Sequence, residues 1–320
     1  MKKLFFTLVA ALMSAVMSFA QSNLVATLSH NGEISVFHGS SAFKQAMEVA
    51  ANGDIVTLAG GRYEAAKITK AITIRGAGIE EDATTGAFPT RISGDIQIDV
   101  DENATNTLEM EGIDAYNITY YNTLERAHFN KCTISGFSYF NTFAAIKSLT
   151  CVNCKITNRA LLSDGSFATY VNCTVACPTG SAEFMNCVIT GSFSGISNSL
   201  FTNCIFGSCF PYSFTPLNST NVATNCVAWG NVFENINQST NVILSDDEYN
   251  ALFKSGTFYE LTDEAKSLYV GSDGKEVGIY GGNFPFDVRI PSPQITKCNV
   301  AAKTTADGKL SVDIEVKAAD

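Results

Sequence analysis

The chain has 320 residues, 46% of them hydrophobic, and a formal net charge of −10. This acidic balance argues against nucleic acid or an anionic membrane surface as a partner. Two lysines, an apolar run over residues 4–19 and a small residue at Ala20 predict a secretory signal peptide, residues 1–20. Its removal leaves 19 basic against 31 acidic residues, a net charge of −12. No later segment approaches the ~20 apolar residues of a membrane span. We therefore expect an exported protein of the periplasm, the cell surface or the medium.

The first predicted element of the mature chain is a helix in "SSAFKQAMEVAANGD", residues 40–54. Ser40 or Ser41 is the expected N-cap, and Gly53 is the expected stop. One face of this helix carries the apolar side chains of Phe43, Ala46, Met47 and Ala50. We expect a cap over residues 36–53, because an amphipathic helix can cover the open end of a stack of strands.

Short strands are predicted next, in "GDIVTLAGGRYEAAKITKAITIRGAG", residues 53–78. Three strands are marked by Ile55, Thr57, Tyr63, Ile68, Ile72 and Ile74. The helix, "GDIVTLAGGRY" and "ITKAITIRGAG" together resemble the start of secreted bacterial right-handed parallel β-helix proteins of the pectin-lyase-like superfamily. The resemblance implies an all-β solenoid over residues 21–290, and polysaccharide as the first class of ligand to consider.

An acidic strand is predicted in "RISGDIQIDVDE", residues 91–102. The calcium-dependent lyases of the superfamily carry acidic clusters near a basic residue, and this segment is similar to that pattern. If the protein is a lyase, the catalytic candidates are Arg91, Asp95 and Asp99. The calcium candidates are Asp95, Asp99, Asp101 and Glu102. The alternative interpretation is a solvated acidic strand without a metal. The clustered aspartates of the superfamily's hydrolases have no match in this chain.

Tyrosines offer a second kind of candidate site, because exposed aromatic faces stack against sugar rings. The candidates for glycan stacking are Tyr116, Tyr120, Tyr121, Tyr139 and Tyr212. The alternative is that these rings fill the interior of the fold, where each hydroxyl would need a polar partner. The sequence alone leaves both interpretations open.

The middle of the chain contains six similar segments, each with a cysteine at its centre. Successive cysteines are 22, 19, 14, 17 and 22 residues apart, and repeats at such intervals are typical of a solenoid. The segments are "FNKCTI", "CVNCKI", "YVNCTV", "FMNCVI", "FTNCIF" and "ATNCVA", centred on Cys132, Cys154, Cys173, Cys187, Cys204 and Cys226.

The phase of the apolar residues in these segments predicts a bend. Apolar residues stand three positions before the cysteine and two positions after it, so they can share a face only if the chain skips one residue. The skip falls on the residue before the cysteine, which in five segments is Asn153, Asn172, Asn186, Asn203 and Asn225. Asparagine tolerates left-handed backbone, so it can bend one strand into the next. The cysteine is then the first inward residue of the new strand.

Equivalent residues of successive coils lie ~4.8 Å apart, so the asparagine amides can form a hydrogen-bonded ladder. The cysteines would stack inside as small buried side chains. Two alternatives to simple packing remain open, namely disulfides between close cysteines and a metal site.

Charged residues are scarce in the repeats, with only seven between residues 127 and 245. A catalytic groove needs carboxylates or bases from several adjacent coils, so this supply is poor. We therefore favour a non-catalytic, polysaccharide-associated binding or structural protein that needs no cofactor. The alternatives are a polysaccharide lyase or glycoside hydrolase and a surface adhesin. The sequence does not indicate an oligomeric state.

The C-terminal part contains two further predicted elements. In "SDDEYNALFKSG", residues 245–256, a helix should begin with a capping box of Ser245 and Glu248 and stop at Gly256. "GSDGKEVGIYGGNFPF", residues 271–286, is similar to the stretch that closes the β-helix in Gram-negative members of the superfamily, so residues 245–290 are expected to close this one. Residues 291–320 form a tail in which an alternating pattern predicts a β-hairpin.

Overall fold

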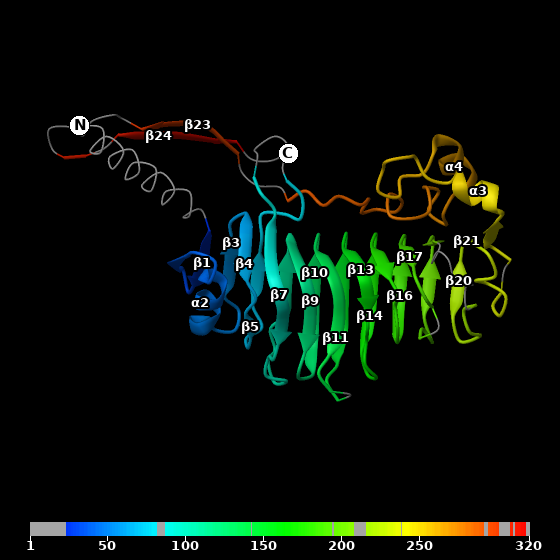
Figure 1. The fold of residues 1–320 in the computed structure, drawn as a ribbon, viewed down its shortest axis with the longest axis horizontal. Coiled ribbons are helices and arrows are strands. Elements are labelled where there is room, and N and C mark those ends of the chain that lie inside the picture. The colour runs from blue at the N-terminus through cyan, green and yellow to red at the C-terminus, as the bar shows by residue number, and fades with distance from the viewer. Residues whose placement is uncertain are drawn as a thin grey trace, which may run out of the picture.

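The computed structural model describes residues 24–81, 87–141, 143–193, 195–207, 216–237, 239–290, 294–300, 308–309 and 311–317. The chain forms a right-handed parallel β-solenoid of about nine turns, which confirms the expected fold class. Figure 1 shows the coils stacked side by side from the N-terminal to the C-terminal end. The predicted signal peptide, residues 1–20, lies outside the described residues.

Sheet A contains the strands that precede the bends. Its order is β2-β1-β3-β6-β8-β10-β12-β14-β16-β18-β20, and neighbours are parallel from β3 onward. The bounds are β2 (Glu33–His38), β1 (Val25–His30), β3 (Ile55–Leu58), β6 (Thr73–Arg75), β8 (Leu108–Glu111), β10 (Leu124–Asn130), β12 (Ile146–Val152), β14 (Phe167–Val171), β16 (Ser181–Met185), β18 (Leu200–Thr202) and β20 (Val222–Thr224).

Sheet B contains the strands that follow the bends. Its order is β22-β21-β19-β17-β15-β13-β11-β9-β7-β4, with β5 also paired to β7, and all pairs are parallel. The bounds are β4 (Gly61–Glu64), β5 (Lys67–Ile68), β7 (Thr90–Ile98), β9 (Ile113–Tyr120), β11 (Thr133–Tyr139), β13 (Lys155–Ala160), β15 (Thr174–Ala176), β17 (Val188–Thr190), β19 (Ile205–Phe206), β21 (Val227–Trp229) and β22 (Val242–Leu244).

The bends between the two sheets have the predicted backbone conformation. The asparagine φ angles lie between 50° and 55°, in the left-handed region, at Asn153, Asn172, Asn186, Asn203 and Asn225. The first repeat has Lys131 at the same place with φ 52°, and the coil before it has Gly112 with φ 64°. A residue with a Cβ meets a cost of roughly 1–2 kcal/mol in this region, which asparagine relieves and glycine avoids.

The interior is lined by the apolar positions on either side of each bend. Tyr170, Phe184 and Phe201 occupy the same place on successive coils, and their rings stack with centroids 5.0 and 4.7 Å apart. Tyr170 pairs in register with Phe184, which shows that the 14-residue interval between Cys173 and Cys187 still spans one full coil. The repeat alignment therefore holds across the shortest repeat.

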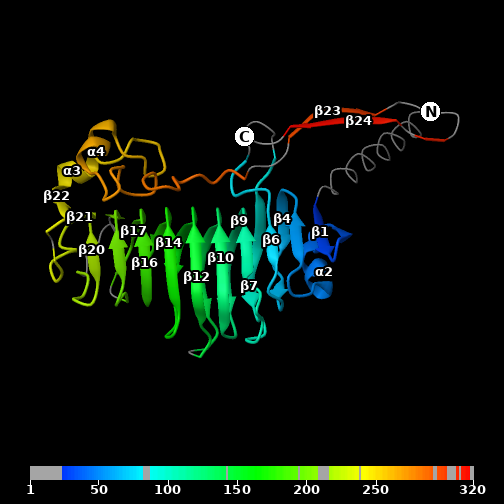
Figure 2. The ribbon, with the colours of Figure 1, turned by 180° about the vertical axis from the view of Figure 1, so that it is seen from behind.

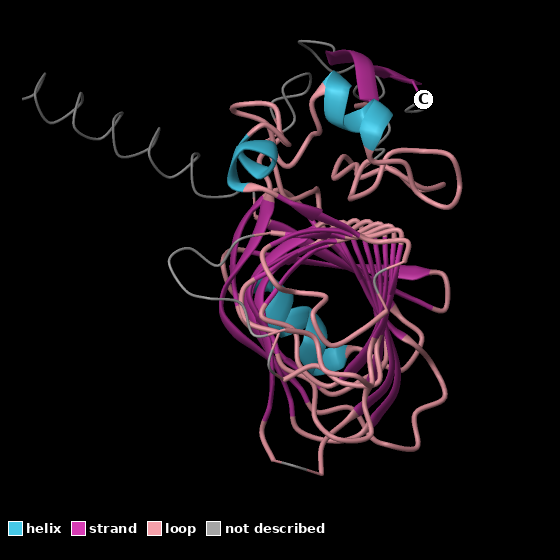
Figure 3. Cartoon of the chain, turned by 90° about the vertical axis from the view of Figure 1, so that its right-hand side faces the viewer, coloured by secondary structure: helices cyan, strands magenta, loops and turns pink. Residues whose placement is uncertain are grey.

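Helix α2 (Ala42–Val49) lies at the N-terminal end of the solenoid, and Figure 3 shows it within the outline of the coils. Its predicted inward residues are buried, namely Phe43, Ala46, Met47 and Ala50. Ser41 is the N-cap, but its hydroxyl makes no capping bond and instead accepts a hydrogen bond from Gln45 Nε2 at 2.9 Å. The helix ends before Gly53, which has φ 89°.

The cap also contains a hairpin that the sequence analysis did not predict. Strands β1 and β2 pair antiparallel, and β1 continues antiparallel onto β3. Asn31 and Gly32 form the turn, with φ 49° and 87°, as the favoured two-residue hairpin turn requires. In β3 the inward residues are Val56 and Leu58, so Ile55 and Thr57 mark the strand but face outward.

Residues 245–270, which we call the module, cover part of the outer face of sheet B. Helix α3 (Asp246–Asn250) begins with the predicted capping box of Ser245 and Glu248, but it ends before Gly256. Helix α4 (Asp263–Leu268) follows, with Thr262 as N-cap. The module and the chain after it bury a second apolar core against outward residues of sheet B. Sheet B contributes Val188, Ile205, Val227 and Leu244. The module and the chain after it contribute Leu252, Leu261, Ala265, Val277 and Ile279.

Residues 271–290, which we call the strap, run back along the row of bends toward the N-terminal end. Ser272 N donates to Asn203 Oδ1 at 2.9 Å, and Lys131 Nζ donates to Arg289 O at 2.7 Å. Figures 1 and 2 show this segment in orange along one side of the solenoid. Residues 271–290 of the expected closing segment, residues 245–290, therefore lie along the bends. At the C-terminal end Val232 and Phe233, in the loop after β21, are buried against the last coils.

The tail contains strands β23 (Gln294–Val300) and β24 (Val312–Lys317), which pair antiparallel. They form a two-stranded sheet separate from sheets A and B.

Candidate functional site

The predicted acidic strand is β7, which ends at Ile98, and its Arg91 and Asp95 lie on the outer face of sheet B. The candidates Asp99, Asp101 and Glu102 follow the strand. Arg91 Nε lies 3.2 Å from Asp114 Oδ2, on the next strand. Asp95 accepts a hydrogen bond from Asn117 Nδ2 at 3.2 Å. Each catalytic candidate is thus engaged with a neighbour on the same sheet.

The calcium candidates are also engaged with neighbours. Asp99 pairs with Lys67 Nζ at 2.5 Å. Asp101 accepts from the backbone and side chain of Asn103, and these bonds lower the pKa of the Asp101 carboxyl. Glu102 is exposed in the same turn. Across the described residues, no group of three or more His, Cys, Asp or Glu side chains could hold a metal ion. The structure therefore does not assemble Asp95, Asp99, Asp101 and Glu102 into a calcium site.

The five candidate tyrosines differ in exposure. Tyr116 is 61% exposed on β9, whereas Tyr120 is fully buried, so Tyr120 is wrong as a stacking residue. The Tyr120 hydroxyl accepts from Ser163 N at 3.2 Å. Tyr139 packs partly against the core, 6.1 Å from the Tyr120 ring. Tyr212 lies outside the described residues.

The half-buried Tyr121 belongs to a group of aromatic residues at the ends of adjacent strands, which we call the aromatic platform: Tyr121 and Phe140, with Phe143 three residues after Phe140. The Tyr121 and Phe140 rings stack with centroids 4.4 Å apart and planes 17° apart. Phe140 is 65% exposed and Phe143 is 89% exposed. Exposed apolar side chains that lie together mark interaction sites.

The register of sheet B explains why these rings meet. The inward residues Ile98 and Tyr120 pair with each other, and Tyr120 pairs with Tyr139. The residues that follow them, Asp99, Tyr121 and Phe140, therefore lie next to one another on the outer side of the sheet. Backbone bonds continue there, from Tyr121 N to Ile98 O at 2.8 Å and from Phe140 N to Tyr120 O at 2.9 Å.

Polar groups from the same coil and from earlier coils lie next to Tyr121 of the platform. Asp99 Oδ1 accepts from Asn122 Nδ2 at 2.5 Å, and its other oxygen faces Lys67. A carboxylate, an ammonium and an amide therefore stand beside two stacked rings. This combination can bind a ring-shaped polyhydroxyl compound, because aromatic faces contact its C–H groups and the polar groups exchange hydrogen bonds with its hydroxyls.

The asparagines at the bends do not form the predicted amide ladder. In the described part of the chain, no hydrogen bond joins one bend asparagine to another. Asn172 Nδ2 instead donates to Ile279 O at 2.7 Å and Gly281 O at 2.8 Å, both in the strap. Buried Oδ1 atoms without a partner remain at Asn153, Asn172 and Asn186. Two of the bend asparagines, Asn172 and Asn203, thus bond to the strap rather than to one another.

The ladder is formed by the cysteines. All six repeat cysteines are fully buried. Each thiol donates to a carbonyl of the preceding coil, as from Cys154 to Phe129 O at 3.4 Å, and Cys154 N in turn donates to Cys173 Sγ at 3.3 Å. Burial raises the pKa of the thiols of Cys132, Cys204 and Cys226. The eight cysteines whose state is described are free, which supports packing over disulfides.

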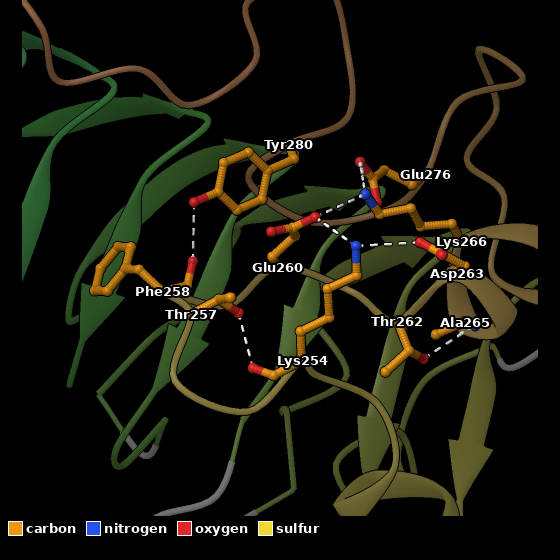
Figure 4. Close-up of polar contacts among 10 residues, drawn as sticks. All are labelled: Lys254, Thr257, Phe258, Glu260, Thr262, Asp263, Ala265, Lys266, Glu276 and Tyr280. Carbon is orange, nitrogen blue, oxygen red and sulfur yellow. Dashed lines mark hydrogen bonds and ion pairs between the residues drawn. The ribbon is translucent and has the colours of Figure 1, made fainter.

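Sequence reasoning missed an ion-pair network between the module and the strap, shown in Figure 4. Glu260 pairs with Lys254 at 2.8 Å and with Lys266 at 3.2 Å, and these bonds lower the pKa of Glu260. Lys254 also pairs with Asp263 at 3.1 Å. Lys266 reaches Glu276 of the strap at 3.8 Å. Most of the network lies within residues 254–266. The lysines and acidic residues of that segment were the one feature of the sequence that could have predicted it.

A second contact that the sequence did not predict is a cation–π contact between the module and the middle of the solenoid. Lys155 Nζ lies 4.3 Å from the centroid of the Phe258 ring and 2.5 Å from Glu80 Oε1. Tyr280 in the strap donates to Phe258 O at 3.1 Å. In these contacts and in the ion-pair network, each charged group named is paired with another group of the protein. We therefore assign both a structural role.

No family model, curated protein or solved structure matches the chain. None of the described helices is long and apolar enough to cross a membrane. A β-solenoid supports many activities, so the function has to be argued from the site itself.

Proposed function

We propose that this chain is an exported, non-catalytic β-helix protein of the pectin-lyase-like type that binds polysaccharide. We place it in the periplasm, at the surface or in the medium of a Gram-negative bacterium. The observation that carries the proposal is the aromatic platform, in which Tyr121 and Phe140 stack at 4.4 Å on successive coils beside Asp99 and Asn122. Exposed rings flanked by hydrogen-bonding groups suit a sugar better than a charged polymer.

The absence of catalysis is proposed from the engagement of the charged candidates. Arg91 is paired with Asp114, and Asp99 is paired with Lys67. A base that removes a proton from substrate must be free to reach it. The alternative of a lyase on this strand remains the main competitor, because Arg91 and Asp95 lie on one outer face of β7 and Asp99 follows directly after it.

Affinity electrophoresis tests the binding site. The mature chain is run through gels that contain neutral or uronate-containing polysaccharides, and retardation reports binding. We expect Phe140→Ala to weaken the binding about tenfold, since loss of one stacked ring removes ~1–1.5 kcal/mol. The matched control is Phe284→Ala, because Phe284 is 64% exposed but lies in the strap, away from the platform. Equal retardation of both variants and the wild type would contradict the assignment of the platform.

A further inference from the structure

The outer face of sheet A has an unusual composition over its C-terminal half, where strands β12, β14, β16, β18 and β20 lie side by side (Figure 2). The strand register places two rows of outward residues on it. The first row is Thr150, Thr169, Glu183, Leu200 and Val222. The second row is Val152, Val171, Met185, Thr202 and Thr224. We call these two rows the threonine–valine face.

The face is flat, partly apolar and almost free of charge. Leu200 and Val222 are 48% and 53% exposed, and the other eight residues are half-buried. Phe167, at the start of β14, is 42% exposed. Glu183 is the one charged residue in the two rows. The same rows on the preceding strands β8 and β10 carry Glu109, Glu111 and His128, so the uncharged character begins at β12.

The two rows differ in chemistry over β12, β14 and β16. One row presents the hydroxyls of Thr150 and Thr169 and the carboxylate of Glu183, and the other presents the apolar side chains of Val152, Val171 and Met185. The rows run across the strands, along the solenoid axis, with a repeat of ~4.8 Å. A ligand that matches this face is therefore an extended chain with apolar and hydroxyl-bearing sides.

The charge of the face selects among extended ligands. The two rows contain no cation, and the exposed Lys147 at the start of β12 is already paired with Glu125. An anionic polymer such as a polyuronate therefore finds no unpaired counter-charge in the rows and meets the carboxylate of Glu183. A symmetric dimer through the same face would bury Glu183 near its centre without a basic partner, and a buried unpaired carboxylate is costly. The hydroxyls of a neutral glycan can donate to this carboxylate while the face stays partly hydrated.

We propose that the threonine–valine face binds a neutral polysaccharide chain laid along the solenoid axis. The inference rests on the proposed function and adds to it a second contact surface and the class of polysaccharide. The aromatic platform belongs to sheet B, so the two surfaces can be tested independently.

Affinity electrophoresis in gels of hydroxyethyl cellulose, galactomannan and polygalacturonate tests the inference. We expect retardation by a neutral polymer and none by polygalacturonate. Thr169→Lys places a long charged side chain in the middle of the face and should weaken the retardation about tenfold. Thr57→Lys is the matched control, because Thr57 faces outward on the same sheet in the first coils. Glu183→Gln, which keeps the shape of the side chain, should weaken the binding by a few fold.

The outcomes separate this inference from the proposed function. If the wild type and both lysine variants are retarded equally, the face is not a binding surface, while polysaccharide binding stands. If the wild type is not retarded in any gel, the proposed function fails, and this inference fails with it. Light scattering provides a further check, because a concentration-dependent dimer that only Thr169→Lys disrupts would identify the face as a protein interface and overturn the inference.

Discussion

The asparagines at the bends have two separable roles, one in their own backbone and one in their side chains. Asn172 adopts φ 50°, and it is fully buried under the strap. Its amide donates to the carbonyls of Ile279 and Gly281. The first role was predictable from the phase of the repeat, because asparagine is the residue that tolerates left-handed backbone. The second role was not predictable, because it depends on a segment more than 100 residues away.

These roles predict different effects for two substitutions of Asn172. Asn172→Ala should lower the free energy of unfolding by about 2–4 kcal/mol, because it leaves two carbonyls unpaired and replaces a residue that tolerates left-handed backbone by one that does not. Asn172→Gly loses the same hydrogen bonds but keeps the conformation, so its loss should be about 1 kcal/mol smaller. Chemical denaturation measures both values. Equal losses would contradict a conformational role for this asparagine.

Glu276 gives a pH-dependent prediction at the same scale. Burial raises the pKa of its carboxyl, and its Oε2 atom has no partner. The folded state therefore holds this proton more tightly than the unfolded chain does. The stabilising contribution is complete below the ordinary glutamate pKa, about 4.3, and is lost as the pH rises through the raised value.

We therefore expect Glu276→Gln to raise the unfolding temperature by about 1 °C at pH 7 and to change it little at pH 4. Differential scanning calorimetry at the two pH values measures the effect. A lower unfolding temperature at pH 7 would mean that the ion pair with Lys266, at 3.8 Å, outweighs the cost of burial.

At the scale of elements, the strap is the feature that most distinguishes this solenoid from a simple stack of coils. It joins the module to the bends and reaches Lys131 near the N-terminal half. Its glycines allow this close approach. A Cβ at Gly282, which has φ 73°, would collide with the side-chain amide of Asn186. The pair Gly281-Gly282 was a visible signal in the sequence, since adjacent glycines often mark a close backbone contact.

Gly282→Ala should therefore release the strap while the coils stay folded. We expect trypsin to cleave at Lys275 and Arg289 several-fold faster in this variant than in the wild type. Gly274→Ala is the matched control, because Gly274 has φ 77° but nothing within 4 Å of an added Cβ. Similar cleavage rates in the two variants would show that backbone strain, and not the contact with the solenoid, controls the release.

At the scale of the whole molecule, the repeat pattern was sufficient to predict the solenoid, because each coil repeats the same bend and the same inward cysteine. The capping box at Ser245 was predictable for a similar reason, since its two residues are three positions apart. The hairpin over residues 25–38 had a local signal in Asn31-Gly32 that the prediction did not use. The position of the strap and the exposure of Tyr120 depend on packing between distant segments, which no local pattern contains.

The candidate site was only partly predictable. Tyr121 was among the predicted stacking residues, but its partner Phe140 was not. Alternation along a strand indicates that Tyr121 and Phe140 face outward. That their rings meet depends on the register between the two strands, which alternation does not give. An acidic strand was predicted over residues 91–102, but β7 ends at Ile98, so Asp99, Asp101 and Glu102 follow the strand. The pairing of Asp99 with Lys67 and of Arg91 with Asp114 depends on the register between strands.

The central claim is that the protein binds polysaccharide without cleaving it. The most direct test incubates the mature chain with the polysaccharides that retard it, with and without calcium, and measures new reducing ends and unsaturated ends. We predict that neither kind of end appears. Unsaturated ends that depend on calcium would contradict the account, identify a lyase, and direct mutagenesis to Arg91, Asp95 and Asp99.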